Sequence, residues 1–555
     1  MENQPATVSA FPQSRLVCLW PWLVVLAVIL FVGFIRVRLL DMPLERDEGE
    51  YAYAGQLILQ GVPPYELAYN MKLPGTYFAC ALGMAVFGQT ISGIHLTLLL
   101  ANSLTIVFVF LLGRKLFGNL AGVAACASYA VMALSPAVAG LAAHANHFVV
   151  LFAVPGTLLL LKANETGGLK VFFWSGLLLG LAFLMKQQGI CFSFFGLFFL
   201  IWVAVRNREF LSKQIGGKIL AFGTGLVLPF SLTCLLFEVA GVFDRFWFWT
   251  VVYARIYESA MPVEMGIRGC LADHLRQTRD LSIGFWALTL AGLLAACFQR
   301  VFRKPMLFTV MFWSFSFLGT AAGLYFRGQY FILLLPAFAL LVGMAVAALQ
   351  SSWRLAWFAD VFKSLPVIAF VLVLGWMIFY QAQPFFQWSA TQVCRNLYPR
   401  NPFVEAVAVG NLLRKDSAGN ARVAVMGSEP EIYFYARRRS ATGYIYTYAL
   451  MESQPHALEM QREMAQEIET NRPEFLVQVQ YQLSWLPEPD SPHYLADWFE
   501  QYAREHYERI GLVGFDPDGK LVSSWGEGSN LPPASLSERI IIFRRKTGLT
   551  GAVAP

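Results

Sequence analysis

The chain has 555 residues, of which 57% are hydrophobic and 14% charged. A soluble globular protein carries about a quarter charged residues, so this composition excludes an ordinary soluble protein. The net charge of +6 comes mostly from short loops between apolar blocks, where basic residues set membrane topology. We therefore expect no nucleic-acid partner.

The apolar residues occur in blocks of about 20, the length that crosses roughly 30 Å of hydrocarbon as a helix. Backbone polar groups in lipid must pair within their own segment, so we expect these blocks to be helical. The sequence predicts a polytopic α-helical membrane protein with about eleven transmembrane helices. Their approximate ranges are 17–38, 92–113, 119–138, 146–162, 170–186, 189–206, 219–240, 281–298, 306–325, 329–349 and 365–381.

Basic residues mark the cytoplasmic side of this arrangement. With the N-terminus inside, every cytoplasmic loop carries Lys or Arg, as in 206–218 and 300–304. Arg36 and Arg38, at the outer end of the first span, run against the rule but are outweighed. The first span has no small-residue cleavage site, so we expect a retained anchor in the cell membrane.

This topology leaves three outer regions: a first loop at 39–91, a second loop at 241–280, and all of 382–555. The last region alternates apolar strands (422–427, 475–480 and 539–544) with polar helical stretches (455–470 and 492–506). That pattern predicts a small extracytoplasmic α/β domain after a transmembrane domain over 1–381. Cys270 and Cys394 both fall outside, which leaves a disulfide between them open.

The first outer loop carries the densest polar sequence, opening with Glu45-Arg46-Asp47-Glu48 and reaching Lys72 through Tyr51 and Tyr65. Residues 51–60 show helical spacing of apolar side chains, which predicts a helix along the membrane surface. Its acids would lie at the N-terminus, where the helix dipole stabilises carboxylates. The alternative is a hydrated loop whose charges merely face water.

Further polar clusters fall on the same outer side. His144, Asn146 and His147 lie between spans three and four, Lys186 between spans five and six, Arg255 in the second outer loop, and Arg327, Gln329 and Tyr330 between spans nine and ten. Each alone could be interfacial: histidine tolerates the headgroup region and lysine snorkels to it. A shared side of the membrane favours one common site.

These residues resemble a known group. Arg46-Asp47-Glu48, Tyr51 and Lys72-Leu73-Pro74 are similar to the first-loop signature of the GT-C membrane glycosyltransferases, in the protein O-mannosyltransferase and aminoarabinose-transferase branch. Residues 112–118, 183–186 and 326–338 resemble later family segments in the same order. Gly75 replaces the second proline, Gln329 replaces a histidine, and Asn146 and His147 stand where many relatives have a second acid.

The resemblance implies a polyprenyl-phosphate sugar donor used on the extracytoplasmic face, with transfer to a hydroxyl of a protein, lipid or glycan. Asp47 and Glu48 would be catalytic, with Asp47 as the base. Lys72 would hold the donor phosphate. Cationic contacts suffice for a phosphate leaving group, which makes Lys186, Arg255 and Arg327 further candidate phosphate contacts. Tyr51, Tyr65, His144, Asn146, His147, Gln329 and Tyr330 would form the acceptor and sugar pocket. No cofactor is expected; the missing second acid disfavours a divalent metal, which stays open.

Two other functions compete with glycosyl transfer. A transporter or flippase of a lipid-linked or small polar substrate would place ionisable residues near the midplane, between inverted repeats. The span centres here carry almost no charge and the chain shows no repeat. A non-catalytic membrane scaffold would leave the first-loop pattern unexplained.

Overall fold

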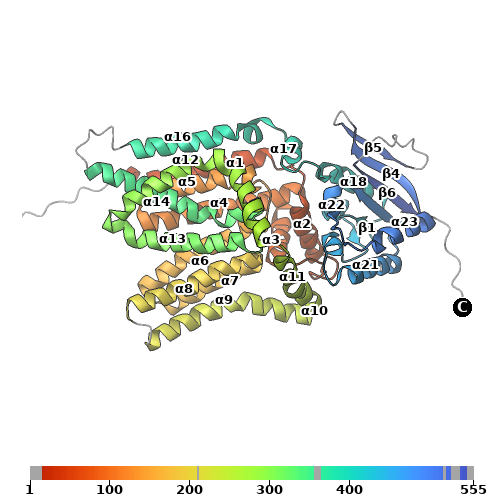
Figure 1. Cartoon of the computed structure of the whole chain (residues 1–555), viewed down its shortest axis with the longest axis horizontal. Coiled ribbons are helices and arrows are strands. Elements are labelled where there is room, and N and C mark those ends of the chain that lie inside the picture. Colours follow the sequence, from red (N-terminus) through yellow and green to blue (C-terminus); the bar gives the residue numbers. More distant parts are fainter. Residues whose placement is uncertain (1–14, 209–211, 356–363, 517–519, 527–537, 547–555) are drawn as a thin grey trace, which may run out of the picture.

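The computed structural model describes residues 15–208, 212–355, 364–516, 520–526 and 538–546. A bundle of long helices forms one end of the molecule and a sheet with its covering helices forms the other (Figure 1). The first outer loop and the second outer loop lie between them. The protein is a multi-pass membrane protein with several apolar helices.

Each of the eleven predicted spans coincides with a helix. These helices are α1 (Arg15–Arg38), α4 (Ile91–Phe117), α5 (Asn119–Met132), α6 (Ala145–Thr166), α7 (Leu169–Met185), α8 (Ile190–Arg206), α9 (Lys213–Val239), α12 (Ala272–Cys297), α13 (Arg300–Ala321), α14 (Leu335–Leu355) and α16 (Leu365–Tyr380). Six helices among the described residues are long and apolar enough to cross a membrane, by length and composition. The number eleven stays a prediction.

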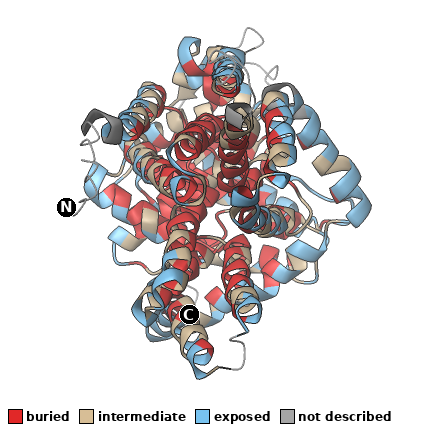
Figure 2. Cartoon of the chain, turned by 90° about the vertical axis from the view of Figure 1, so that its left-hand side faces the viewer, coloured by how far each residue is buried: buried red, intermediate tan, exposed pale blue. Residues whose placement is uncertain are grey.

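The outer surface of the bundle is apolar. Leu30 and Phe34 of α1 and Leu235 of α9 are more than half exposed. In Figure 2 the buried residues lie on the inner helices and the exposed ones on the outward faces of the bundle. Exposed leucine and phenylalanine along whole helices suit a hydrocarbon environment, because lipid tails satisfy them as well as a protein core would.

The two arginines that oppose the positive-inside rule have structural roles. Arg36 is buried and donates to the carbonyl oxygens of Ala133 and Gly140, at 3.3 and 2.9 Å. Arg38 donates to the carbonyl oxygens of Pro384 and Trp388, both at 2.5 Å. They satisfy carbonyls at the ends of neighbouring segments, so their charge does not report topology.

The first outer loop contains two helices, α2 (Arg46–Leu59) and α3 (Gly75–Phe87). A helix is present where we expected one at 51–60, and its placement along the membrane surface stays a prediction. Helix α2 begins five residues earlier and is buried on nearly every face from Glu48 to Leu57. Helix α3 was not predicted, because its 13 residues reach only about 20 Å and fall short of a membrane span.

The second outer loop is a chain of short helical turns. It comprises α10 (Phe243–Trp247), the π-helical turn η3 (Phe248–Tyr253), α11 (Ala254–Ser259) and η4 (Met265–Leu271), which runs into α12. A 3₁₀ segment, η5 (Gly328–Leu333), precedes α14. The thiols of Cys270 and Cys394 are both free, so the disulfide left open above does not form.

The C-terminal region is built on a mixed six-stranded sheet in the order β2-β1-β3-β6-β4-β5. Its strands are β1 (Arg422–Met426), β2 (Arg439–Ser440), β3 (Phe475–Gln480), β4 (Tyr507–Phe515), β5 (Leu521–Trp525) and β6 (Arg539–Arg545). Its helices are α17 (Ala390–Leu397), α18 (Phe403–Asp416), α19 (Glu431–Ala436), α20 (Tyr448–Met451), α21 (Ala457–Asn471), α22 (Gln482–Trp485) and α23 (Tyr494–His506). The three predicted strands and both predicted helices are present, whereas β2, β4 and β5 were not predicted.

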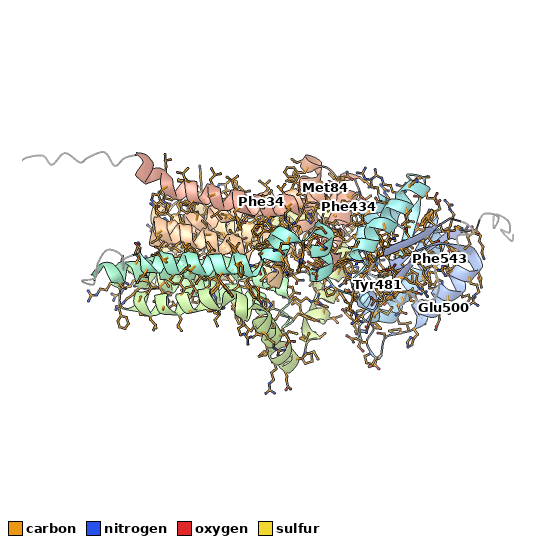
Figure 3. All side chains as sticks on the ribbon, turned by 90° about the horizontal axis from the view of Figure 1, so that it is seen from above. Phe34, Met84, Phe434, Tyr481, Glu500 and Phe543 are labelled. Carbon is orange, nitrogen blue, oxygen red and sulfur yellow. The ribbon has the colours of Figure 1, made fainter. Side chains whose placement is uncertain are left out.

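The sheet region and the first outer loop share one hydrophobic core. That core joins Tyr53 of α2 and Met84 of α3 to Tyr433 and Phe434 of α19. The rings of Tyr53 and Tyr433 stack with centroids 5.1 Å apart. Figure 3 labels Met84 and Phe434 at this junction, far from Phe543 in the sheet. A domain boundary at residue 381 stays a prediction.

Candidate active site

The N-terminus of α2 fixes the position of Asp47. Glu45 is the N-cap: its side chain accepts from the backbone N–H of Glu48, and the Glu48 side chain accepts from the N–H of Glu45. This reciprocal capping box satisfies two otherwise unpaired donors and starts the helix at Arg46. Asp47 therefore lies in the first helical turn, where the helix dipole stabilises a carboxylate.

Asp47 is held by three side chains from distant parts of the chain. Its Oδ1 accepts from Lys72 Nζ at 2.7 Å and from the Tyr446 hydroxyl at 3.2 Å. Its Oδ2 lies 3.7 Å from His144 Nδ1. The first outer loop, the turn before α6 and the C-terminal region thus meet at this carboxylate.

Lys72 is bonded to a second carboxylate that the sequence analysis missed. Its Nζ lies 2.5 Å from Glu50 Oε2, and Glu50 is fully buried. Glu50 also accepts from the Asn70 amide at 2.9 Å and from the Tyr77 hydroxyl. Two acids therefore flank one ammonium group, and two of the three N–H donors of Lys72 are used within the protein.

The charges in this cluster move the pKa values in opposite directions. Burial opposes ionisation of Asp47, but Lys72 and His144 outweigh it and hold the pKa of Asp47 well below its ordinary value. Burial raises the pKa of Glu45 to about 7, and the nearby charge of Asp47 adds to the rise. The pKa values of adjacent carboxylates move apart in this way because two negative charges close together repel each other. Asp47 is the ionised member.

Tyr51 and Tyr65 support Lys72 from behind. Lys72 Nζ lies 4.8 Å from the centroid of the Tyr51 ring, within cation–π range. The Tyr65 hydroxyl donates to the backbone carbonyl of Lys72 at 2.7 Å. Both tyrosines are buried, so they orient the lysine and do not contact the cavity.

Glu48 does not line the cavity. It is fully buried, accepts from the N–H of Ala143 at 2.5 Å, and sits 3.3 Å from His95 Nε2. Together with its role in the capping box, these contacts use its oxygens inside the protein. The structure does not bring Glu48 to the substrate side, where it was expected beside Asp47.

A second cationic group faces Asp47 from the membrane bundle. Lys186, the C-terminal cap of α7, donates from Nζ to Asn146 Oδ1 at 2.9 Å and lies 4.2 Å from the centroid of the Tyr330 ring. Asn146 is itself 3.4 Å from the side chain of Gln188. Burial lowers the pKa of Lys186 to about 7. Among the described residues no carboxylate forms a salt bridge with it.

Arg327 lies near Lys186 and has no salt-bridged acid in the described part of the chain. Its Nη2 donates to the Tyr257 hydroxyl at 2.8 Å, and Tyr257 stacks on Tyr325 with ring centroids 4.6 Å apart. Arg255, which was expected beside it, is exposed and does not line the cavity. The phosphate-binding role expected for Arg255 has no geometric support.

These groups line a cavity of about 500 Å³ between the bundle and the C-terminal region. Of the residues selected from the sequence, it is lined by Asp47, Lys72, Lys186, Arg327, Gln329 and Tyr330. Glu48, Tyr51, Tyr65, His144, Asn146, His147 and Arg255 are not in the lining. His147 is buried 3.5 Å from Asn102 Nδ2, away from His144 and Asp47, so the two histidines do not form one site.

The C-terminal region contributes cavity residues that the sequence analysis did not select. Tyr446, Tyr448 and Glu452 line the cavity, and Glu452 accepts a hydrogen bond from the Tyr253 hydroxyl. Tyr446 is 399 positions from Asp47, a separation that no local pattern reveals. Glu50 had a detectable signal, since it lies three residues after Asp47 and such residues share a helix face.

One group of side chains offers a geometry that a cation could use. Ligand atoms of Glu45, Asp47 and His144 lie within 4.8 Å of one another, and both ring nitrogens of His144 lack a hydrogen-bond partner. A carboxylate–imidazole set fits a divalent ion such as Zn²⁺. However, the Lys72 ammonium already neutralises Asp47 at 2.7 Å, so the fit is partial.

Comparison with known proteins agrees with this architecture. The family model described as dolichyl-phosphate-mannose-protein mannosyltransferase matches residues 72–237. The undecaprenyl phosphate-alpha-4-amino-4-deoxy-L-arabinose arabinosyl transferases of Pseudomonas aeruginosa strain UCBPP-PA14 and Pseudomonas paraeruginosa are 29% and 30% identical over 220 and 224 residues. Each match covers 37% of this chain and 38% of the relative's length.

Solved structures share the fold over most of the chain. ArnT from Cupriavidus metallidurans bound to undecaprenyl phosphate superposes with a TM-score of 0.60 at 15% identity, covering 98% of this chain and 100% of that one. The archaeal oligosaccharyltransferase AglB from Archaeoglobus fulgidus gives 0.50 at 13% identity, covering 94% and 76%. The chain is therefore similar to membrane glycosyltransferases in sequence over residues 72–237, and it shares the fold of these solved structures over most of its length.

Proposed function

We propose that the protein transfers a sugar from a polyprenyl-phosphate donor to an acceptor hydroxyl. The observation that carries the proposal is one cavity with an ionised carboxylate, Asp47, on one side and two cations, Lys186 and Arg327, on the other, neither of which has a salt-bridged acid among the described residues. A base and an anion site are the two elements that such a transfer needs. The relatives named above are transferases, which favours transfer over the transporter hypothesis.

The chemistry of each step follows from these positions. Asp47 accepts the proton of the acceptor hydroxyl as the oxygen forms a bond to the anomeric carbon. The bond between that carbon and the phosphate oxygen breaks, and its electron pair leaves with the phosphate. Lys186 and Arg327 stabilise the charge that develops there. The polyprenyl tail would remain in lipid, which accounts for a site at the bundle's end.

The geometry changes the role proposed for Lys72. From the resemblance it would be the first phosphate contact, yet it is bonded to Asp47 at 2.7 Å and Glu50 at 2.5 Å. We assign Lys72 to keeping Asp47 ionised and oriented. Lys186 and Arg327 are the primary phosphate contacts, and Gln329 and Tyr330 belong to the sugar pocket beside them.

We propose that transfer needs no divalent metal. Lys72 supplies the positive charge at Asp47 that a metal would otherwise supply, and the phosphate departs without protonation.

The acceptor hydroxyl belongs to a protein, lipid or glycan. The site faces outward from the cell membrane, with the N-terminus inside and the C-terminal region outside, because the basic loops lie at the opposite ends of the helices.

Reconstitution into proteoliposomes tests the proposal. Purified protein would be given a radiolabelled polyprenyl-phosphate sugar and an envelope extract as acceptor, with label followed into product and into the vesicle lumen. Transfer predicts a new labelled glycoconjugate that is absent with Asp47→Asn. Sequestered, chemically unchanged label would instead establish a transporter.

A reporter fusion tests the proposed orientation. A phosphatase fused near residue 530 should be active if the C-terminal region lies outside, and an inactive fusion would reverse the proposed topology.

A further inference from the structure

The edge of the C-terminal sheet that faces the membrane bundle receives a side chain from α2. Strands β1 and β3 are parallel neighbours, with Val423 opposite Phe475, so their carboxyl ends lie at the same edge. Open α/β sheets bind ligands at this edge. Here the residues that follow the two strands, Ser428 and Ser484, belong to a hydrogen-bond network around Arg46.

Arg46 occupies the sheet edge where such folds bind ligands, and it contacts the sheet by hydrogen bonds and ring contacts. Its Nε donates to the carbonyl oxygen of Ser428 at 2.5 Å, and its Nη2 donates to Glu429 Oε1 at 2.9 Å. The guanidinium lies 5.4 and 5.3 Å from the ring centroids of Phe403 and Tyr448. The Glu429 side chain is 0% exposed and that of Arg46 is 12% exposed, where Arg46 borders the cavity beside Asp47.

Both loops of the sheet edge are bound to one another beneath Arg46. Glu429 Oε2 accepts from the Ser484 hydroxyl at 2.5 Å, and the same hydroxyl accepts from the N–H of Ser428 at 2.9 Å. The backbones of α2 and α19 also approach so closely that a Cβ added at Gly49 would lie 2.6 Å from the Cβ of Glu431. The first turn of α2 is therefore seated rigidly on the sheet.

We propose that Arg46 is a positioning residue and that the C-terminal sheet sets the geometry of the proposed base. Asp47 is the next residue after Arg46, and its carboxylate also accepts from Tyr446 of the same C-terminal region. Displacement of a reacting group by about 1 Å can cost around 10²-fold in rate. The inference rests on the proposed function, since it assigns the C-terminal region a part in that reaction.

The double variant Arg46→Met with Glu429→Gln separates positioning from stability. Arg46→Met alone would leave a buried carboxylate unpaired and destabilise the fold. Removing both charges relieves that cost, so we expect the melting temperature of the double variant to return close to wild type. The kcat should nevertheless stay about 10²-fold below wild type, with the donor KM nearly unchanged.

A second ion pair provides a matched control. Arg245 of α10 pairs with Glu463 of α21, so it also joins an outer loop to the C-terminal region, but away from Asp47. Arg245→Met with Glu463→Gln should keep the wild-type kcat. If both double variants lost the same activity, or if kcat of the Arg46 variant recovered together with its stability, Arg46 would have no positioning role.

Hydrogen exchange distinguishes a failure of this inference from a failure of the proposed function. The backbone amides of residues 46–50 should exchange faster in the Arg46 double variant than in the Arg245 double variant, whether or not sugar transfer is detected. Equal exchange in the two variants would show that Arg46 does not hold the first turn of α2 in place. An inactive wild-type protein with this difference in exchange would count against the proposed function alone.

Discussion

The two sides of the cavity carry charge in different ways. On the side of the first outer loop, Lys72 is bonded to Asp47 and Glu50, so its charge is compensated within the protein. On the side of the bundle, Lys186 is bonded to the neutral Asn146 and Arg327 to the neutral Tyr257. In the proposed reaction, the compensated side would hold the base in place, whereas the uncompensated side would bind an anion.

The contrast has an electrostatic cause. A buried cation without an acid loses solvation, which is why burial lowers the pKa of Lys186 to about 7. Burial also acts on Lys72, but Asp47 and Glu50 outweigh it and raise the pKa of Lys72 well above its ordinary value. A phosphate that binds at Lys186 and Arg327 would supply the missing negative charge. Both cations would therefore be more stable with the ligand bound than without it.

The largest expected effect comes from Asp47 on the compensated side. Asp47→Asn keeps the shape but removes the basic oxygen, so kcat should fall by about 10²–10⁴-fold while donor binding survives. Steady-state kinetics and binding of undecaprenyl phosphate would measure the two quantities. Near-normal turnover of the purified variant would show that Asp47 is not the base.

Glu48→Gln is the matched control for that variant. The Glu48 carboxylate is bonded to the N–H groups of Glu45 and Ala143 and does not line the cavity. We expect its loss to lower thermal stability and to cost less in kcat than Asp47→Asn. A dead but stably folded Glu48→Gln would shift the assigned base by one residue.

The uncompensated side should control donor affinity. Lys186→Ala removes a charged contact worth roughly 1.5–3 kcal/mol, so donor Kd should rise about 10- to 100-fold with a smaller effect on kcat. Lys72→Ala should show the reverse pattern, because it leaves Asp47 and Glu50 facing each other without a cation. If Lys72→Ala weakened donor binding more than Lys186→Ala did, the two roles would be exchanged.

Rising pH should weaken donor binding through Lys186. Lys186 is charged below its pKa of about 7 and loses the charge as pH rises through that value, so kcat/KM for the donor should fall on the alkaline side of neutrality. Asp47, with its pKa held low, stays ionised throughout this range. Lys186→Arg should abolish the fall, because a guanidinium stays protonated. An unchanged alkaline limb in that variant would assign the ionisation elsewhere.

The sequence predicts the membrane helices well because long apolar blocks have few alternatives in lipid. It fails for α3, which is apolar but only 13 residues long. At the site, Asp47 and Lys72 were predictable from the acidic start of a helix and the family resemblance. The structure places Glu50, rather than Glu48, at Lys72 beside Asp47, because a neighbouring residue points about 100° away on a helix whereas the third residue shares the face.

The contribution of the C-terminal region could not be predicted. Tyr446 meets Asp47 across 399 positions, and Arg46 meets Glu429 across 383. No periodicity or short motif connects residues so far apart. Tertiary packing alone brings them together, and it also buries α2 on nearly all faces, which its sequence did not predict.

The smallest expected effect is that of a chelator. Glu45, Asp47 and His144 offer three ligand atoms within 4.8 Å, so a metal could in principle take the place that we assign to Lys72. The ammonium at 2.7 Å from Asp47 already supplies the positive charge, and a divalent ion beside it would add repulsion. We therefore expect EDTA to leave initial rates at the wild-type level, and His144→Gln to retain the same donor affinity. Activity abolished by EDTA and restored by Mn²⁺ or Zn²⁺ would contradict this, and would make the compensated side a metal site with His144 as a ligand.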